Sequence, residues 1–246
     1  MDLNKKRILD LIEENYVFAS VIRHFGIDFY DYPELKFSET CVTKGLKPEL
    51  VLSGFEDVLE NDQSHFQYLM SLPIDVVLCY LKHKHYAFIK QTLPYLAKLI
   101  HSYPAAEQSI INNIRVQFPL FVEDFIRQMH VEEEVIFEFI KNIDGAINGN
   151  INFSKLFFEL KKNSIKAISE THSNQDDVMF GIRKLTNNYT LEKDPPVLLK
   201  VIYSELQSFE RNLIIHAQIE NEVLLPKALV LEKELYKLMA KHSHLN

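Results

Sequence analysis

Two short stretches of the chain repeat one pattern, in which a histidine is followed four residues later by a glutamate. They are His130–Glu134 and His216–Glu220. Residues at i and i+4 lie on one face of a helix, about 6 Å apart along its axis, so each pair can present an imidazole and a carboxylate to one point. Apolar residues flank both pairs in the same helical phase, which predicts that the pairs point inward. A buried carboxylate or imidazole is costly unless it is paired or bound to a metal.

Two further histidines are expected on the buried faces of other helices. His85 follows Leu81 by four residues and precedes Phe88 by three, so it continues an apolar face. His83 is rotated from His85 by about 200° around a helix and is expected at the surface. His172 likewise continues the apolar face of the residues before it. The sequence therefore predicts one inward histidine ahead of each histidine–glutamate pair.

The spacing indicates an internal duplication, because His85 precedes His130 by 45 residues and His172 precedes His216 by 44. Four histidines and two glutamates inside a helical bundle suit a di-iron or di-manganese site. The predicted ligands are His85, His130, Glu134, His172, His216 and Glu220. If both glutamates bridge the metals together with an oxo or hydroxo group, each metal keeps one open position for dioxygen, nitric oxide or peroxide.

An interpretation without metal has to be weighed against this one. A single histidine–glutamate pair at helical spacing often arises by chance, and an inward histidine is more often a hydrogen-bonded core residue than a ligand. The repetition of the pair, each time after an in-phase histidine, favours the metal site. The neighbouring Glu132 and Glu133 are expected to be solvated or to lie behind the ligands. No residue is singled out as catalytic, so the sequence does not decide between an enzyme and a binding protein.

The elements that must position these residues are helices. Glycine is scarce, with 6 residues, and aliphatic residues recur at helical rather than strand-like spacing. Four long helices are predicted over residues 73–102, 107–143, 153–188 and 194–241, separated by segments that carry proline or glycine. Long helices with short connections predict an all-α, up-down-up-down four-helix bundle. Pro119 and Pro226 are expected to cause local kinks or breaks.

A small helical N-terminal domain is predicted over residues 1–66, ahead of the bundle at 67–246. Its first helix is expected over residues 2–24 and ends near Gly26, and Pro48 opens another short helix. A domain of this size is marginally stable alone. Its apolar character is an argument for pairing with a second copy in a homodimer.

Composition and charge exclude several classes of function. Lys and Arg together number 27 against 34 Asp and Glu, and no basic run is interleaved with aromatics, so a nucleic-acid partner is not expected. The N-terminus lacks the apolar core of a signal peptide, and no stretch approaches a transmembrane span. Cys41 and Cys79 form neither a disulfide framework nor a zinc-type spacing. A cytoplasmic protein without a membrane partner is therefore expected.

Four local strings resemble the hemerythrin-like superfamily, and within it the RIC (repair of iron centres) di-iron proteins of the YtfE/ScdA type. The strings are HYAFIKQTLPYLAKL from position 85, HVEEEVIFEFI from 130, SETHSNQDDVMFGIRKLTNNY from 169 and FERNLIIHAQIENEVLLPKAL from 209. The resemblance covers most of residues 73–231. It implies a non-haem di-iron cluster held by the six residues predicted above. It also implies a role in repairing iron-sulfur clusters damaged by nitrosative or oxidative stress.

The N-terminal residues resemble the small domain that precedes the bundle in that family, with one departure. Where the family carries adjacent cysteines followed by glycines, this chain has Tyr30-Asp31-Tyr32-Pro33. A dithiol redox role or thiol-mediated iron transfer is therefore not carried over. The first functional hypothesis is repair of damaged iron-sulfur proteins by iron donation or nitric oxide processing. The alternative is reversible binding or sensing of dioxygen or nitric oxide, as in hemerythrin-like carriers.

Overall fold

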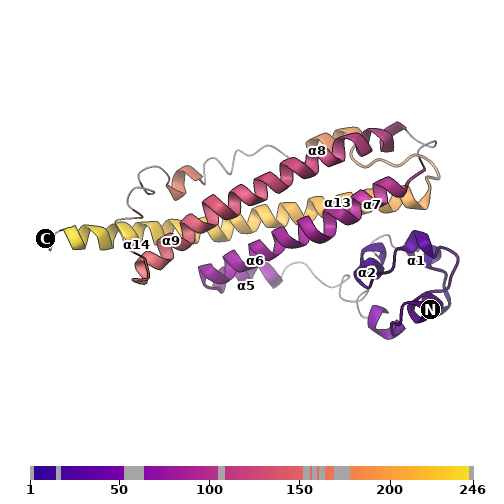
Figure 1. Ribbon diagram of the computed structural model, residues 1–246, viewed down its shortest axis with the longest axis horizontal. Coiled ribbons are helices and arrows are strands. Elements are labelled where there is room, and N and C mark those ends of the chain that lie inside the picture. Colours follow the sequence, from indigo (N-terminus) through magenta and orange to yellow (C-terminus); the bar gives the residue numbers. More distant parts are fainter. Residues whose placement is uncertain are drawn as a thin grey trace. The chain divides into compact units, whose positions relative to one another are not determined.

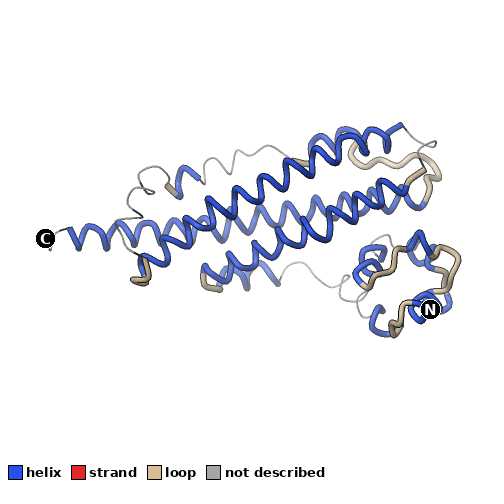
Figure 2. The backbone as a smooth tube through the Cα atoms, viewed as in Figure 1, coloured by secondary structure: helices blue, strands red, loops and turns tan. Residues whose placement is uncertain are grey.

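The chain is described by a computed structural model. It covers residues 3–14, 18–52, 64–104, 109–151, 156, 160, 164–168 and 178–243. Every regular element in these ranges is a helix, and an isolated β-bridge joins Arg7 to Lys36. Figure 2 shows the described part as helices joined by loops, without a strand. The predicted all-α class is confirmed for these residues. None of the helices in them combines the length and the apolarity that a membrane span requires.

Three long helical stretches are described, each made of an α-helix, a π-helical turn (η) and a second α-helix (Figure 1). The first consists of α6 (Ile74–Ala87), η3 (Phe88–Thr92) and α7 (Leu93–Ser102). The second consists of α8 (Ser109–Val131), η4 (Glu132–Phe137) and α9 (Glu138–Ile147). The third consists of α13 (Val197–Ile219), η5 (Glu220–Leu224) and α14 (Leu225–Ser243). These stretches agree with three of the four helices predicted from the sequence.

Two of the π turns are followed by a leucine and then a proline. The Leu93 N–H donates to the Phe88 carbonyl and the Leu225 N–H to the Glu220 carbonyl, each bond reaching back five residues. The next residue, Pro94 or Pro226, has no N–H and its ring crowds the carbonyl four residues earlier in a regular helix. A wider turn lets the helix continue past each proline. The break expected at Pro226 is therefore a π turn, whereas Pro119 lies inside α8.

The fourth predicted helix, residues 153–188, is described only in part. Leu156, Leu160 and residues 165–168 are helical, and α12 (Phe180–Leu185) follows. Leu156, Leu160 and Ile165 are buried. Residues 169–177, which include the predicted ligand His172, lie outside the described residues.

The chain divides into two compact units. The N-terminal unit consists of Met1–Ser64, Tyr95–Val116 and Gly181–Arg211. The second, which we call the site unit, consists of His65–Pro94, Gln117–Phe180 and Asn212–Asn246. The domain boundary between residues 66 and 67 stays a prediction.

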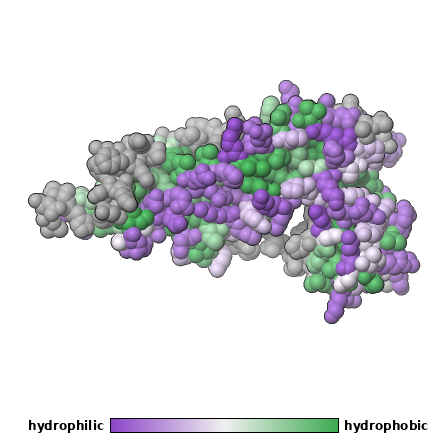
Figure 3. Space-filling model, in the orientation of Figure 1, coloured by the Kyte–Doolittle hydropathy of each residue, from purple (hydrophilic) through white to green (hydrophobic). Residues whose placement is uncertain are grey.

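The core of the site unit is formed by the apolar faces of α5 (Ser64–Ser71), α6, α9 and α14. Its buried residues include Leu69, Val77, Leu81, Ile140, Ile143, Leu156, Leu160, Ile165, Val223 and Leu235. Burial of each such side chain contributes about 1.5–3 kcal/mol. Hydrophilic residues cover much of the face in Figure 3, with hydrophobic patches between them. The helices of this unit are thus held together by apolar packing, and this packing also positions their polar residues.

The N-terminal unit contains η1 (Leu3–Lys5), α1 (Ile8–Glu14), α2 (Phe18–His24), η2 (Phe29–Asp31) and α3 (Phe37–Thr43). The helix expected over residues 2–24 is thus described as more than one element, and residues 48–52 form the short helix expected at Pro48. Gly26 has φ of 77°, and the N–H groups of Gly26 and Ile27 bond the carbonyls of Arg23 and Ile22. These two bonds form a Schellman motif, and the helix ends near Gly26 as predicted.

Candidate metal centre

Four donor side chains converge in the site unit. His85, Glu132, His216 and Glu220 each offer one ligand atom, and these atoms all lie within 4.8 Å of one another. Their side chains are buried, with relative exposures of 0% for His85, 3% for Glu132, 5% for His216 and 3% for Glu220. They come from all three long stretches, so the packing of α6, η4, α13 and η5 assembles the group.

Each of the three stretches reaches the group at its π turn. His85 lies three residues before η3, Glu132 is the first residue of η4, and Glu220 is the first residue of η5. His216 precedes Glu220 by one regular helical turn. Single π turns inside α-helices occur frequently at functional sites, because the extra residue changes which side chains face inward. The π turns and the donor side chains therefore lie at the same positions along the three helical stretches.

The distances within the group suit one shared cation. His85 Nε2 lies 3.0 Å from His216 Nε2 and 3.5 Å from Glu132 Oε2. His216 Nε2 lies 3.4 Å from Glu220 Oε1. Two ligand atoms that each sit about 2.0–2.2 Å from one ion, at ordinary bond angles, are roughly 2.9–3.5 Å apart. Imidazole nitrogens and carboxylate oxygens together suit iron, manganese and zinc.

The surroundings of the group favour a bound cation as well. Carboxylates as deeply buried as those of Glu132 and Glu220 are costly unless they are paired or coordinate a metal. The donor chemistry and the burial of the four side chains both fit a metal ion in the group.

Aromatic rings enclose the two histidines. Phe137 stacks on His85, with ring centroids 5.5 Å apart and planes inclined by 18°. Phe88 meets His216 edge to face at 5.8 Å, and Phe125 meets Phe88 at 6.1 Å. These rings exclude water, and the low local dielectric strengthens every electrostatic interaction in the group.

Burial also sets the protonation of His85. Loss of solvation, and then the nearby His216 ring, lower the pKa of His85 below its ordinary value of 6.5, although Glu133 opposes the shift. His85 Nδ1 lies 2.8 Å from Glu133 Oε1. The imidazole is therefore neutral near pH 7, which is the form that binds metals.

Three of the predicted site residues lie in the group, namely His85, His216 and Glu220. His83 is exposed while His85 is buried, so the helical phase predicted for this segment is confirmed. His172 lies outside the described residues, and its role as a ligand stays a prediction.

The inward orientation predicted for His130 and Glu134 is wrong, because both side chains are exposed and neither lies in the group. The buried face of α8 runs through Phe125 and Met129. Continuing that face by three residues reaches Glu132 rather than His130 or Glu134. Glu132 could therefore have been predicted from the sequence, because it lies on the same helical face as Phe125 and Met129.

Glu133 contacts the His85 ring from the side away from the group, which fits the expectation that it is solvated or lies behind a ligand. The same expectation for Glu132 is wrong, because Glu132 is buried within the group. A further buried carboxylate, Glu232 on α14, accepts a hydrogen bond from the Ile165 N–H at 3.0 Å. It thereby holds the start of the helical residues 165–168, which precede His172 in the sequence.

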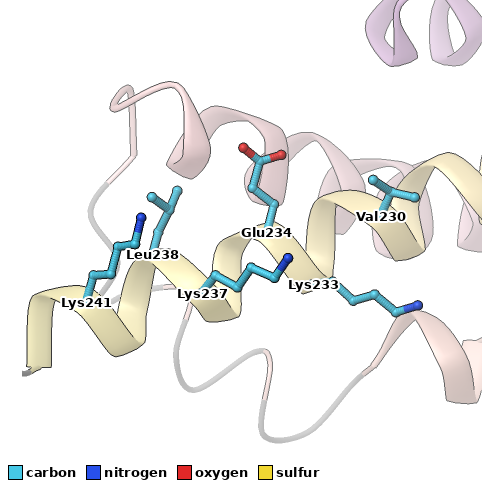
Figure 4. A pocket seen from close by; sticks show the side chains of 6 residues that line it. All are labelled: Val230, Lys233, Glu234, Lys237, Leu238 and Lys241. Carbon is cyan, nitrogen blue, oxygen red and sulfur yellow. The ribbon is translucent and has the colours of Figure 1, made fainter.

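A surface hollow on α14 is separate from the donor group. It is lined by Val230, Lys233, Glu234, Lys237, Leu238 and Lys241 (Figure 4). All six side chains come from one helix, and none of them is a donor of the group. The candidate metal chemistry therefore belongs to the buried donor group and not to this hollow.

Comparison with known proteins finds a distant similarity. No model of a protein family matches the chain. The chain is 18% identical over 237 residues to the iron-sulfur cluster repair protein ScdA of Staphylococcus haemolyticus. The alignment covers 92% of this chain and 99% of that protein. The similarity thus extends over nearly the whole of both chains and supports the resemblance to iron-centre repair proteins that the local strings carry.

Proposed function

We propose that this protein binds iron and takes part in the repair of damaged iron-sulfur clusters. The observation that carries the proposal is the buried convergence of His85, Glu132, His216 and Glu220. The similarity to ScdA over nearly the whole chain supports iron as the metal and repair as the role. Manganese is the alternative metal by donor type.

The centre that we propose is a non-haem di-iron cluster with an oxo or hydroxo bridge. Two histidines and two glutamates of the described residues would hold the metal, and His172 is the candidate for a further ligand. We also propose that the segment at 153–188 completes a four-helix bundle around the cluster, as in hemerythrin-like proteins. Bound iron would supply a position for dioxygen, nitric oxide or peroxide.

The residues of the chain itself have distinct roles in this proposal. The buried carboxylates of Glu132 and Glu220 offset the positive charge of the metal. Phe88 and Phe137 keep water away from His85 and His216. Together these groups provide a dry, negatively charged site on rigid helices.

The cysteines do not contribute an iron-transfer path in this proposal. Cys41 is buried, and burial raises the pKa of its thiol above the ordinary value, so the reactive thiolate is disfavoured. Cys79 is exposed and single in its helix. Repair by this protein would therefore proceed from the histidine–carboxylate centre, with damaged iron-sulfur proteins as the partners.

Reactivation of a damaged enzyme tests the function. A [4Fe–4S] dehydratase is inactivated with nitric oxide and then incubated with the iron-loaded protein or with free iron at equal concentration. We expect faster reactivation by the protein. Glu220→Ala should lose this advantage, whereas the exposed-site variant Glu134→Ala should keep it. Equal reactivation by free iron would refute the repair role.

Burial of the donors keeps reversible binding of dioxygen or nitric oxide as the second candidate. None of the four donor residues is more than 5% exposed, and Phe88 and Phe137 lie against the histidines. Such a site admits a small uncharged molecule more readily than it releases iron. An absorption band that forms with dioxygen and disappears on deoxygenation would support this candidate, and irreversible oxidation would count against it.

A further inference from the structure

The His85 ring is contacted on both nitrogens by consecutive residues of η4. Nδ1 lies 2.8 Å from Glu133 Oε1, and Nε2 lies 3.5 Å from Glu132 Oε2. Consecutive side chains of a regular α-helix point about 100° apart. Glu132 and Glu133 are the first two residues of a π turn, and their side chains flank the same ring.

The contact with Glu133 defines where the proton of the ring sits. An ionised carboxylate only accepts hydrogen bonds, so the 2.8 Å contact requires a hydrogen on Nδ1. The Glu133 side chain is 30% exposed, so its carboxylate keeps contact with solvent. A neutral imidazole carries a single N–H, and Nε2 is then left with its lone pair. That lone pair faces the other donors of the group.

We propose that Glu133 is a positioning residue that fixes His85 as the Nδ1–H tautomer and turns an unprotonated Nε2 toward the donor group. Its role as a support for a metal ligand rests on the function proposed above. The tautomer itself belongs to the metal-free protein and does not depend on that function. Carboxylates behind metal-binding histidines act in this way in many metal sites.

The same geometry makes the two histidines inequivalent. His216 Nε2 lies 3.0 Å from His85 Nε2, so in the metal-free protein it must carry a hydrogen and donate to that lone pair. This leaves His216 Nδ1 as the unprotonated nitrogen, which agrees with its lack of a hydrogen-bond partner among the described residues. For Nε2 to bind a metal, the single ring proton of His216 would have to move from Nε2 to Nδ1, which leaves the ring neutral. His85 is already in its binding form, and His216 has to change.

Nitrogen NMR of the full-length, metal-free protein tests the inference directly. Histidines labelled with ¹⁵N are assigned with His85→Gln and His216→Gln, and two-bond couplings show which ring nitrogen is protonated. We expect His85 protonated at Nδ1 alone and His216 protonated at Nε2. With Zn²⁺ as a diamagnetic probe, His85 should keep its Nδ1 proton and His216 should lose its Nε2 proton.

Three variants separate positioning from a general structural effect. Glu133→Leu should release the Nδ1 preference of His85 and weaken Zn²⁺ binding by about 10–100-fold. Glu133→Gln keeps an acceptor oxygen and should restore the tautomer and most of the affinity. Glu134→Leu, at the exposed neighbour, is the matched control and should change neither. If Glu133→Leu does not fold, the spectra of the wild type and of Glu133→Gln decide.

The outcomes distinguish this inference from the proposed function. A wild-type His85 protonated at Nε2 would overturn the inference whether or not metal binds. An unchanged His85 tautomer in folded Glu133→Leu would overturn it as well. The expected tautomers in a protein that binds neither zinc nor iron would support the inference and refute the proposed function alone.

Discussion

Replacing Glu132 by Gln should have opposite effects on the metal-free and the metal-loaded protein. The Glu132 carboxylate is buried close to that of Glu220, and the neighbouring His85 is neutral because burial lowers its pKa. Without metal, both carboxylates have lost solvation and they repel each other. Exchanging one of them for a neutral amide of equal size removes desolvation cost and repulsion. Replacing whole buried ion pairs by neutral groups of similar volume stabilises other proteins by about 1–4 kcal/mol, which sets the upper limit of the gain that we expect here.

With metal the sign reverses, because Glu132→Gln removes one of the charged donors. Loss of residues behind the ligands already weakens metal binding about 10–100-fold, so we expect at least a tenfold loss for a ligand, about 1.4 kcal/mol. At a metal concentration of about 100 times the dissociation constant, binding stabilises the folded state by roughly 2.7 kcal/mol. At least about half of that increment should therefore be lost in the variant.

Thermal unfolding with and without metal measures both effects. For a chain of this size, 1 kcal/mol corresponds to roughly 2–4 °C in Tm. We expect the metal-free Tm of Glu132→Gln to rise and its increase on addition of metal to shrink. Glu134→Gln is the matched control, since its exposed side chain should change stability by no more than about 0.5 kcal/mol. The reasoning is refuted if metal-free Glu132→Gln is less stable than the wild type, or if Glu134→Gln alone loses the metal effect.

Three further predictions follow from the same geometry. His85→Ala should lose bound metal and any oxo-bridge absorption, while His83→Ala should keep both. Metal analysis of the two purified variants tests this, and the opposite result would show that the buried face of α6 is wrongly assigned. Glu220→Ala should retain less metal per chain than the wild type, and full occupancy would remove Glu220 from the ligand set. Burial lowers the pKa of His85 below 6.5, so the unfolded chain binds more protons in acid. Stability of the metal-free protein should therefore fall as pH drops below about 6.5, and a pH series of denaturant unfolding should show a weaker fall in His85→Gln.

The helices could be predicted from the sequence because their signals are local. Proline and glycine mark the ends of the long stretches, and α2 ends near Gly26 as predicted. The orientation of His85 was equally accessible, since Leu81 and Phe88 fix its phase within two turns. His216 and Glu220 lie one turn apart in a continuous apolar face, and both side chains are buried as predicted.

The second ligand helix was harder to predict because three glutamates follow one another at 132–134. The spacing of His130 and Glu134 equals that at 216–220 and predicts that these two residues point inward. Phe125 and Met129 indicate a different buried face, which contains Glu132. The spacing of two residues in a motif does not show which side of the helix faces the core. The positions of the buried apolar residues do show it. Contacts across helices, such as that of Glu133 with His85, depend on tertiary packing and leave no local signal.

The π turns have a consequence for how the chain tolerates length changes. At two of them the next buried position lies five residues further on, from Phe88 to Leu93 and from Glu132 to Phe137. At η5 the buried residues are Glu220, Val223 and Leu224, followed by Leu225. Deleting one residue inside such a turn restores a regular helix without breaking it, yet it rotates everything beyond by about 100° relative to the part before. The extra residue thus sets the rotation between the buried face before the turn and the buried face after it. Insertions and deletions at these three places should be far less tolerated than the ease of extending a helix would suggest.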